Sequence, residues 1–226
     1  MVKVFIDPGH GGVDPGAVAN GLQEKEITLQ LAKEIQKILL NEYENIAIKM
    51  SRTTDQTVSL NSRTALANHW NADIFLSIHI NAGKGTGFES YIYSNVGKMT
   101  KKYQDIIHNT IIKQVGFKDR GKKQADFHVL RNTKMPAVLT ENGFIDTLQD
   151  SDRLKDPEFI RKLARGHVFG LAKALGLKKK DHNVTNSPSS QPLYKVQIGA
   201  FKNRKNAELL AEQAVQSGYN VIIIEE

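Results

Sequence analysis

Short apolar runs rich in β-branched residues alternate with stretches of helical periodicity, and this alternation constrains the fold more than any other feature of the chain. The apolar runs predict strands at residues 2–6, 46–50, 74–80, 88–93 and 137–140. The periodic stretches predict helices at residues 24–40, 60–68, 98–115 and 157–175. Strands that alternate with helices in this way predict an α/β fold, in which helices cover both faces of a largely parallel or mixed sheet.

A change of composition after Leu177 predicts two domains joined by a linker. Residues 1–177 contain all the strands and helices named above, which is enough chain for one substantial domain. Residues 178–192 are polar, contain Pro, Ser and Asn, and lack apolar periodicity, as a linker does. Residues 193–226 predict one small β-α-β unit, formed by YKVQIGAF, a helix around 207–215, and YNVIII. A unit of this size is too small to bury a core alone.

The chain contains no cysteine, and this limits the chemistry available to it. Disulfides, iron–sulfur clusters, thiolate zinc sites and cysteine nucleophiles are excluded, so a metal would need His, Asp or Glu ligands. No apolar run approaches the roughly 20 residues that span a bilayer, and we expect no membrane span. The apolar run at residues 2–6 is also too short for the core of a secretory signal, so we expect synthesis in the cytoplasm and later release.

Positive charge is concentrated in one segment of the chain. The formal net charge is +7, and the segment from Lys98 to Lys134 holds ten Lys or Arg against Asp105, Asp119 and Asp126. Such a segment suits a polyanionic partner, which could be a wall polymer, a nucleic acid or a lipid headgroup. A solvated basic surface that keeps the protein soluble is the alternative.

Four polar residues are predicted to meet at one edge of the sheet. Sites in open α/β sheets lie beyond the carboxyl ends of the strands. His10 follows the first predicted strand, His79 lies near the end of IFLSIHIN, and Glu141 follows AVLT. Glu24 begins the first predicted helix, which starts at the same edge. Two imidazoles and a carboxylate are a standard ligand set for a catalytic zinc ion, which keeps its fourth position for water.

Each of these residues also has a simpler interpretation. His10 could be a structural residue in a glycine-rich turn, and His79 could be a core histidine with a satisfied ring. Glu24 could be an acid that stabilises the first turn of a helix. Glu141 is either a turn acid or a catalytic base. Only the convergence of all four on one sheet edge favours the metal site.

Further residues near this edge have open roles. Glu89 rivals Glu141 as the catalytic base, and the residues alone do not rank the two. His128, in DFHVLR, could face the substrate or pack at the rim. Asp7 could orient a ligating imidazole, or it could be an ordinary acid at a strand end.

Several motifs together resemble one enzyme family. FIDPGHGGVDPGA, LQEKEITL, SRTTD, LNSRTALANHWNADIFLSIHIN, GFESYIY and DRGKKQADFHVLRNTKMPAVLTENGFI are similar to the zinc-dependent N-acetylmuramoyl-L-alanine amidases of bacterial cell walls. The resemblance covers about residues 2–175. It implies a mixed six-stranded sheet flanked by helices and one zinc ion, Zn2+. It places the ligands on His10, Glu24 and His79, and the catalytic glutamate on Glu141 rather than Glu89.

The resemblance also implies a reaction and its substrate. The substrate would be peptidoglycan, and the bond cut would be the amide between N-acetylmuramic acid and L-alanine of the stem peptide. The protein would act at the bacterial cell wall after its release. Zinc lowers the pKa of a bound water and polarises the carbonyl, and Glu141 would move the proton as general base. Arg52, Arg63 and backbone amides of the glycine-rich loop are candidate donors to the oxyanion, although both arginines suit structural roles.

The C-terminal unit resembles half of a sporulation-related (SPOR) repeat domain, a family that binds peptidoglycan glycan strands. The complete domain has two β-α-β halves, and residues 193–226 supply one. One hypothesis is that two chains pair their halves in a homodimer. A truncated form of the domain is the alternative.

Three other functions compete with the amidase. A non-catalytic wall-binding protein would not need the four site residues. A nucleic-acid module is disfavoured because YKVQIGAF lacks the paired stacking motif of RNA-recognition domains, so we expect no nucleic-acid partner. Within enzymes, a zinc peptidase that cuts inside the stem peptide would use the same ligand set.

Overall fold

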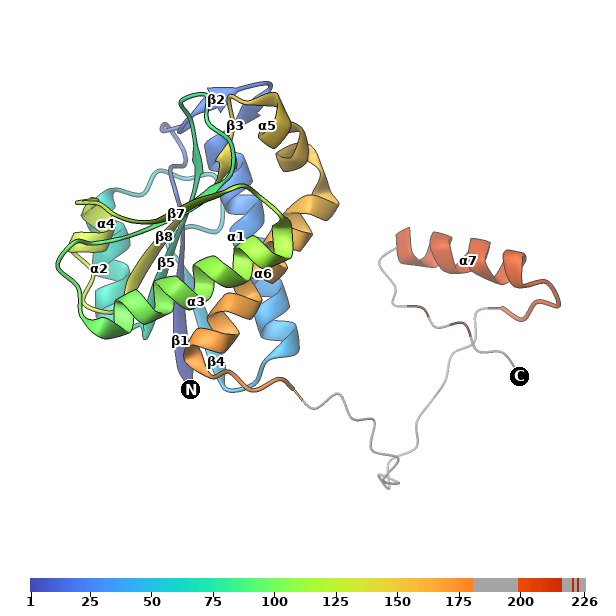
Figure 1. The fold of residues 1–226 in the computed structure, drawn as a ribbon. Coiled ribbons are helices and arrows are strands. Elements are labelled where there is room, and N and C mark those ends of the chain that lie inside the picture. Colours follow the sequence, from blue (N-terminus) through green and yellow to red (C-terminus); the bar gives the residue numbers. More distant parts are fainter. Residues whose placement is uncertain (181–198, 217–220, 222, 224–226) are drawn as a thin grey trace. The chain divides into compact units, whose positions relative to one another are not determined.

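The computed structural model describes residues 1–180, 199–216, 221 and 223 (Figure 1). The chain divides into two compact units, Met1–Asp181 and His182–Glu226. Within the described residues, no helix has both the length and the apolar character needed to cross a membrane.

The first unit is built on one mixed sheet of six strands in the order β4-β1-β5-β8-β6-β7. Neighbouring strands are parallel except for β6 and β8, which are antiparallel. The strands are β1 (Val2–Pro8), β4 (Ile46–Met50), β5 (Ile74–Asn81), β6 (Phe88–Ile92), β7 (Asp119–Gln124) and β8 (Ala137–Phe144). The expected α/β fold with a mixed, mostly parallel six-stranded sheet is therefore confirmed.

Helices cover both faces of this sheet (Figure 1). The larger core packs α1 (Glu24–Glu42), α3 (Lys98–Val115) and α6 (Pro157–Leu175) on one face. The smaller core packs α2 (Leu60–Trp70) and α4 (His128–Arg131) on the other.

Alternating side chains of the strands supply the two cores. In β1, Val4 and Ile6 belong to the larger core, whereas Phe5 between them belongs to the smaller one. In β5, Leu76 and Phe75 divide in the same way. Successive side chains of a strand point to opposite faces, so a strand covered on both faces is apolar throughout.

Five short elements were not predicted from the sequence. These are the edge strand β7, helix α5 (Leu148–Lys155), helix α4, and a hairpin of β2 (Val18–Ala19) with β3 (Leu22–Gln23). The last predicted strand is also longer than expected. It continues past Thr140 to Phe144, because residues on both sides of Glu141 pair with β5 and β6. Glu141 therefore lies inside a strand rather than in the turn that the sequence suggested.

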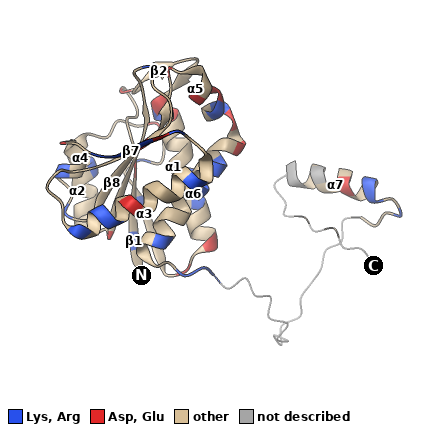
Figure 2. Ribbon diagram, viewed as in Figure 1, with Lys and Arg blue, Asp and Glu red and all other residues tan. Residues whose placement is uncertain are grey.

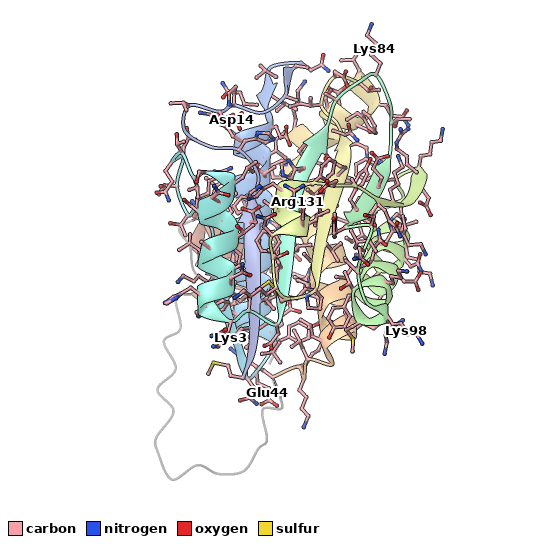
Figure 3. The ribbon with its side chains drawn as sticks, turned by 90° about the vertical axis from the view of Figure 1, so that its left-hand side faces the viewer. Lys3, Asp14, Glu44, Lys84, Lys98 and Arg131 are labelled. Atoms are coloured by element: carbon pink, nitrogen blue, oxygen red, sulfur yellow. The ribbon has the colours of Figure 1, made fainter. Side chains whose placement is uncertain are left out.

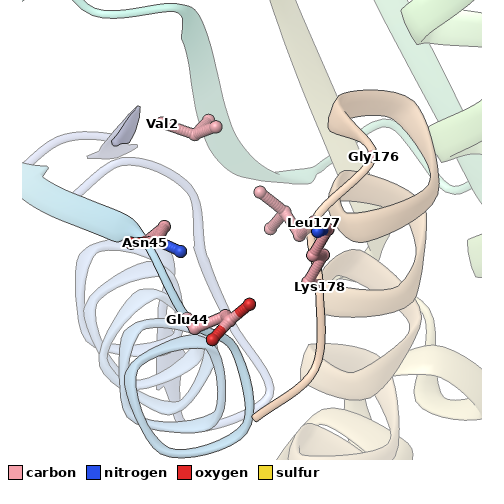
Figure 4. A pocket seen from close by; sticks show the side chains of 6 residues that line it. All are labelled: Val2, Glu44, Asn45, Gly176, Leu177 and Lys178. Atoms are coloured by element: carbon pink, nitrogen blue, oxygen red, sulfur yellow. The ribbon is translucent and has the colours of Figure 1, made fainter.

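The first residues of the predicted linker are attached to the end of α1. The amide of Glu44 donates to the carbonyl of Lys178, and the amide of Lys180 donates to the carbonyl of Glu42. Beside this contact, a cavity of about 210 Å³ opens between the start of β1 and the end of α6 (Figure 4). Its lining comes from Val2, Glu44, Asn45, Gly176, Leu177 and Lys178.

In the second unit, the structure describes helix α7 (Arg204–Gln216), where the sequence predicted a helix around residues 207–215. Most of the two predicted strands on either side of it, and residues 181–192 of the predicted linker, lie outside the described residues. The boundaries 1–177, 178–192 and 193–226 therefore stay a prediction.

Candidate active site

A glycine-rich loop carries His10 away from the end of β1. His10 has φ 60°, and the next two residues, Gly11 and Gly12, have φ 121° and 62°. A non-glycine residue is uncommon in this left-handed region and needs support from its surroundings. Mutual backbone hydrogen bonds between Gly11 and Asp14 close the loop. The side chain of Arg63 fixes it further by donating to the carbonyl of His10 at 2.6 Å.

Two buried arginines hold this loop in place. Arg52 donates to the carbonyls of Pro8 and Gly9 at 3.2 and 2.8 Å. Arg63 donates to the carbonyl of Pro8 at 2.7 Å and forms an ion pair with Asp7 at 2.8 Å. Their nitrogens are occupied by protein oxygens, so the structure assigns both arginines a positioning role, not that of oxyanion donors.

Asp7 does not orient an imidazole, which the sequence had left open. Its two oxygens accept hydrogen bonds from Arg63 and from the hydroxyl of Ser77, both at 2.8 Å. The residue that contacts the first imidazole is Asp14, whose Oδ2 lies 2.8 Å from His10 Nδ1. No sequence pattern singles out Asp14, because only the fold of the loop brings it back to His10.

Glu24 is the first residue of α1, and its buried carboxylate points into the site. Oε2 accepts from the amide of Ala17 at 2.9 Å, and Oε1 accepts from the amide of Ile80 at 3.0 Å. The same carboxylate joins both imidazoles, with His10 Nε2 at 3.1 Å and His79 Nδ1 at 3.0 Å. A solvated acid in a first helical turn would not make these contacts. Glu24 is therefore part of the site.

His79 projects from β5 beside the loop that carries His10. The two imidazole rings lie 4.9 Å apart at an angle of 80°. Gly9 is needed for this approach, because a Cβ atom there would lie 2.4 Å from Cε1 and 2.6 Å from Nε2 of His79. One ligand atom from each of His10, Glu24 and His79 lies within 4.8 Å of the others, so the three can hold a single metal ion.

Mutual contacts set the charge states of these three side chains. Burial disfavours protonated imidazole, but Glu24 and Asp14 outweigh it and raise the pKa of His10 to about 9. Burial also opposes protonation of His79, and Glu24 and Glu141 outweigh it and raise its pKa. Burial would raise the pKa of Glu24, whereas both imidazoles lower it far below its usual range. The site thus gathers positive charge around one carboxylate, and a divalent cation would displace those protons.

Glu141 lies beside this group, in register with His79 on the neighbouring strand. Its Oε2 is buried and has no hydrogen-bond partner among the described residues. Burial is the main cause that raises the pKa of Glu141 to about 7, and the charges of Glu24 and Glu89 add to it. A carboxyl group with this pKa can both accept and release a proton near neutral pH.

Glu89, the rival base, lies opposite Glu141 in the antiparallel pair of β6 and β8. Burial would raise its pKa, but hydrogen bonds from Lys123, Tyr91 and Arg120 outweigh it and lower the pKa. The oxygens of Glu89 lie 2.5 Å from Lys123 Nζ and 2.9 Å from Arg120 Nε. Glu89 is thus held in its ionised form, its oxygens accept hydrogen bonds from side chains of β7, and it anchors that edge strand.

The side chains face a cavity of about 570 Å³ at the carboxyl edge of the sheet. His10, His79 and Glu141 line it, together with residues 57–60 and 127–129. Figure 3 shows Asp14 on the loop beyond the carboxyl end of β1, with Lys3 and Glu44 at the opposite end of the molecule. A cavity of this size can hold a small ligand, or one segment of a larger one, next to His10 and His79.

Comparisons with known proteins identify the family of the chain. The N-acetylmuramoyl-L-alanine amidase family matches residues 4–173, and the SPOR domain matches residues 176–226. The chain is 58% identical over 224 residues to the sporulation-specific N-acetylmuramoyl-L-alanine amidase of Bacillus subtilis (strain 168), covering 99% of this chain and 85% of that one. It is 45% identical over 195 residues to the endolysin of Bacillus phage SPP1, covering 84% and 72%.

A solved structure matches the first unit. The N-acetylmuramoyl-L-alanine amidase from Clostridium difficile 630 superposes with a TM-score of 0.75 at 36% identity. The match covers 77% of this chain and 97% of that one. The arrangement of strands and helices that carries the four site residues is therefore shared with a solved amidase.

Proposed function

Since this chain belongs to the N-acetylmuramoyl-L-alanine amidase family, we propose that it is a zinc-dependent hydrolase of peptidoglycan that uses Glu141 as general base. The bond cut is the amide between N-acetylmuramic acid and L-alanine of the stem peptide. The observation that carries the proposal is the convergence of His10, Glu24 and His79 next to the unpartnered Oε2 of Glu141.

The donor set fits a zinc ion. Zinc accepts imidazole nitrogen and carboxylate oxygen, and catalytic sites use three protein ligands so that one position stays open. His10, Glu24 and His79 provide these atoms within 4.8 Å of one another. Zinc held there would polarise the amide carbonyl and make a bound water more acidic. Asp14, at 2.8 Å from Nδ1 of His10, would orient that ring and leave its Nε2 for the metal.

Glu141 moves the proton in this mechanism. Its ionised carboxylate accepts a proton from the attacking water, and the protonated carboxyl then donates to the nitrogen of the departing L-alanine. Burial raises the pKa of Glu141 and so favours uptake of the proton, whereas a bound cation would favour its release. Glu89 cannot do the same, because three charged or hydroxyl donors and Asn81 already occupy its oxygens.

Digestion of purified peptidoglycan tests the proposal. Mass spectrometry of the products separates release of whole stem peptides, starting at L-alanine, from cuts inside the peptide. We expect whole stem peptides, no activity after complete removal of the metal, and recovery when zinc is returned. Glu141→Gln should keep the fold and bind zinc but lose nearly all activity. Near-normal release by that variant would reject Glu141 as the base, and cuts inside the peptide would favour the zinc peptidase.

The basic segment suggests a second contact with the wall, for which we propose anionic wall polymers as partner. Figure 2 shows Lys and Arg along α3 and at β7. Among the described residues, four of the ten basic side chains pair with carboxylates, namely Arg120, Lys122, Lys123 and Arg131. The other six are exposed and form no ion pair within the described part of the chain, namely Lys98, Lys101, Lys102, Lys113, Lys118 and Lys134.

Wall sedimentation tests this contact. Binding through these lysines should fall steeply as salt is raised, and it should fall when anionic polymers are stripped from the wall. Lys101→Glu combined with Lys102→Glu should weaken binding to intact walls without affecting binding to stripped walls. Equal binding of the variant and the parent to intact walls would assign the segment to solubility alone.

We propose the bacterial cell wall as the place of action, with the C-terminal unit binding glycan strands. The SPOR match at residues 176–226 supports this role. A variant truncated after Lys180 keeps the backbone hydrogen bonds of Lys178 and Lys180 with Glu44 and Glu42. This variant should bind walls more weakly than the full chain. The pairing of two C-terminal units stays a prediction, and the solution mass of the two forms tests it. Equal monomeric masses would exclude pairing.

A further inference from the structure

His128 has a buried nitrogen for which the fold provides no partner. Within the described residues, four buried side-chain atoms lack a hydrogen bond, and His128 Nε2 and Glu141 Oε2 are two of them. Both residues line the same cavity. Leaving a buried polar atom unpaired costs about 1–3 kcal/mol, so such atoms in a native site call for an explanation.

The fold holds His128 in place without using its ring. The residue begins α4, where the amide of Asn132 donates to its carbonyl at 2.9 Å. The next two residues, Val129 and Leu130, are buried in the smaller core. The preceding ring of Phe127 packs 5.2 Å from that of Tyr91. These contacts fix the backbone position from which His128 extends to the cavity wall.

The other nitrogen-bearing side chains of the cavity wall, Arg63, His10 and His79, each contact protein oxygens. The three side-chain nitrogens of Arg63 donate to backbone carbonyls and to Asp7. His10 and His79 contact Glu24 and form the metal set. Among the imidazoles that line this cavity, His128 alone has a buried ring nitrogen that no protein group satisfies, within the part of the chain that the structure describes.

Amide hydrolysis is accelerated by such a donor. As water attacks, negative charge develops on the carbonyl oxygen, and a fixed donor aimed at that position lowers the barrier. We propose that His128 is a catalytic residue whose Nε2–H donates a hydrogen bond to the carbonyl oxygen of the scissile amide. The bond strengthens as that oxygen becomes anionic, and no proton is transferred. This inference rests on the proposed function, because it takes the amide and Glu141 as given.

Two substitutions test the role. His128→Phe keeps an aromatic ring in the site but removes the donor, and His128→Gln keeps an N–H close to the position of Nε2. His69→Phe is the matched control, because His69 is an exposed histidine on α2. Zinc content and thermal melting are measured for every variant. If His128→Phe is unfolded by melting, His128→Leu serves in its place.

The expected result is a loss in kcat. Removal of one oxyanion donor lowers kcat about 10²- to 10³-fold in other enzymes. We expect a loss of this order for His128→Phe with KM within about twofold, at least tenfold recovery in His128→Gln, and no change in His69→Phe. A kcat within threefold of the parent, a loss confined to KM, or equal losses in the Phe and Gln variants would overturn the role.

The same assay separates this inference from the proposed function. If the parent enzyme cuts a different bond, or works without metal, the proposed function fails whatever the His128 variants do. If the parent releases whole stem peptides with zinc and Glu141→Gln is inactive, only the His128 comparison remains to decide the donor.

Discussion

Replacing Glu141 with glutamine should stabilise the metal-free fold at alkaline pH, although we expect the same change to remove activity. Burial raises the pKa of Glu141 from an ordinary 4.5 to about 7. Between these values the folded chain keeps a proton that the unfolded chain releases, so the free energy of unfolding falls as the pH rises through this window. Glutamine has a similar size and never ionises, so it avoids this loss.

The two pKa values set the size of the effect. A tenfold change in proton affinity is worth about 1.4 kcal/mol, so the ionised Glu141 costs the folded state about 3 kcal/mol above pH 7. At pH 5 the carboxyl is still protonated in the fold, and the cost is about 1 kcal/mol. We expect the free energy of unfolding of Glu141→Gln to exceed that of the parent by these amounts. The increase of this difference between pH 5 and pH 8 is the result that tests the raised pKa.

Urea unfolding at pH 5 and pH 8 measures the difference. The protein is first treated with a chelator, because a bound cation would lower the pKa of the carboxyl. Glu89→Gln is the matched control on the facing strand: it removes a carboxylate whose pKa is lowered by its donors, so it should destabilise the fold at both pH values. A gain for Glu141→Gln that is equal at the two pH values, or a loss at pH 8, would refute the reasoning.

Three further outcomes follow from the site. Gly9→Ala places a Cβ 2.4 Å from the ring of His79, so metal affinity, measured by titration calorimetry, should fall at least tenfold. Gly97→Ala is the control, because a Cβ there lies within 4 Å of nothing. Unchanged affinity in Gly9→Ala would contradict the close contact of Gly9 with His79. Because the pKa of His10 is raised to about 9, metal binding at pH 7 should release at least one proton. Calorimetry in buffers of different ionisation enthalpy measures this release, and no release would exclude a protonated His10. Arg52→Met leaves buried carbonyls without donors and should lower the free energy of unfolding, measured in urea, by about 3 kcal/mol. A change below about 0.5 kcal/mol would contradict the role of Arg52 in holding the loop after β1.

Apolar patterning predicted the central strands because these strands are covered on both faces. β1 and β5 place consecutive side chains in two cores, so they read as continuous apolar runs. The edge strand β7 has the sequence DRGKKQ and carries no such signal. It is held by pairing with β6 and by the contacts of Arg120 and Lys123 with Glu89, which only the folded chain reveals.

The rule that places sites at strand ends predicted that His10, Glu24, His79 and Glu141 lie together, but it could not describe their contacts. His10, His79 and Glu24 meet because β1, β5 and α1 share one edge, and that edge can be predicted from strand order. The roles of Asp14 and Arg52 depend on how the loop after β1 folds, with three successive residues at positive φ. No periodic pattern encodes such a loop, so these contacts required coordinates.

The two facing glutamates show why residue type alone could not identify the base. Glu89 and Glu141 occupy opposite positions on neighbouring strands and share the same sheet face. Glu89 accepts from Asn81, Tyr91, Arg120 and Lys123, which stabilise its charge and lower its pKa. Glu141 has a buried oxygen with no donor, and its pKa rises to about 7. The donors on the edge strand therefore hold Glu89 ionised as an anchor of β7 and leave Glu141, the proposed base, without a donor, and the fixed charge of Glu89 helps to keep Glu141 able to take up a proton.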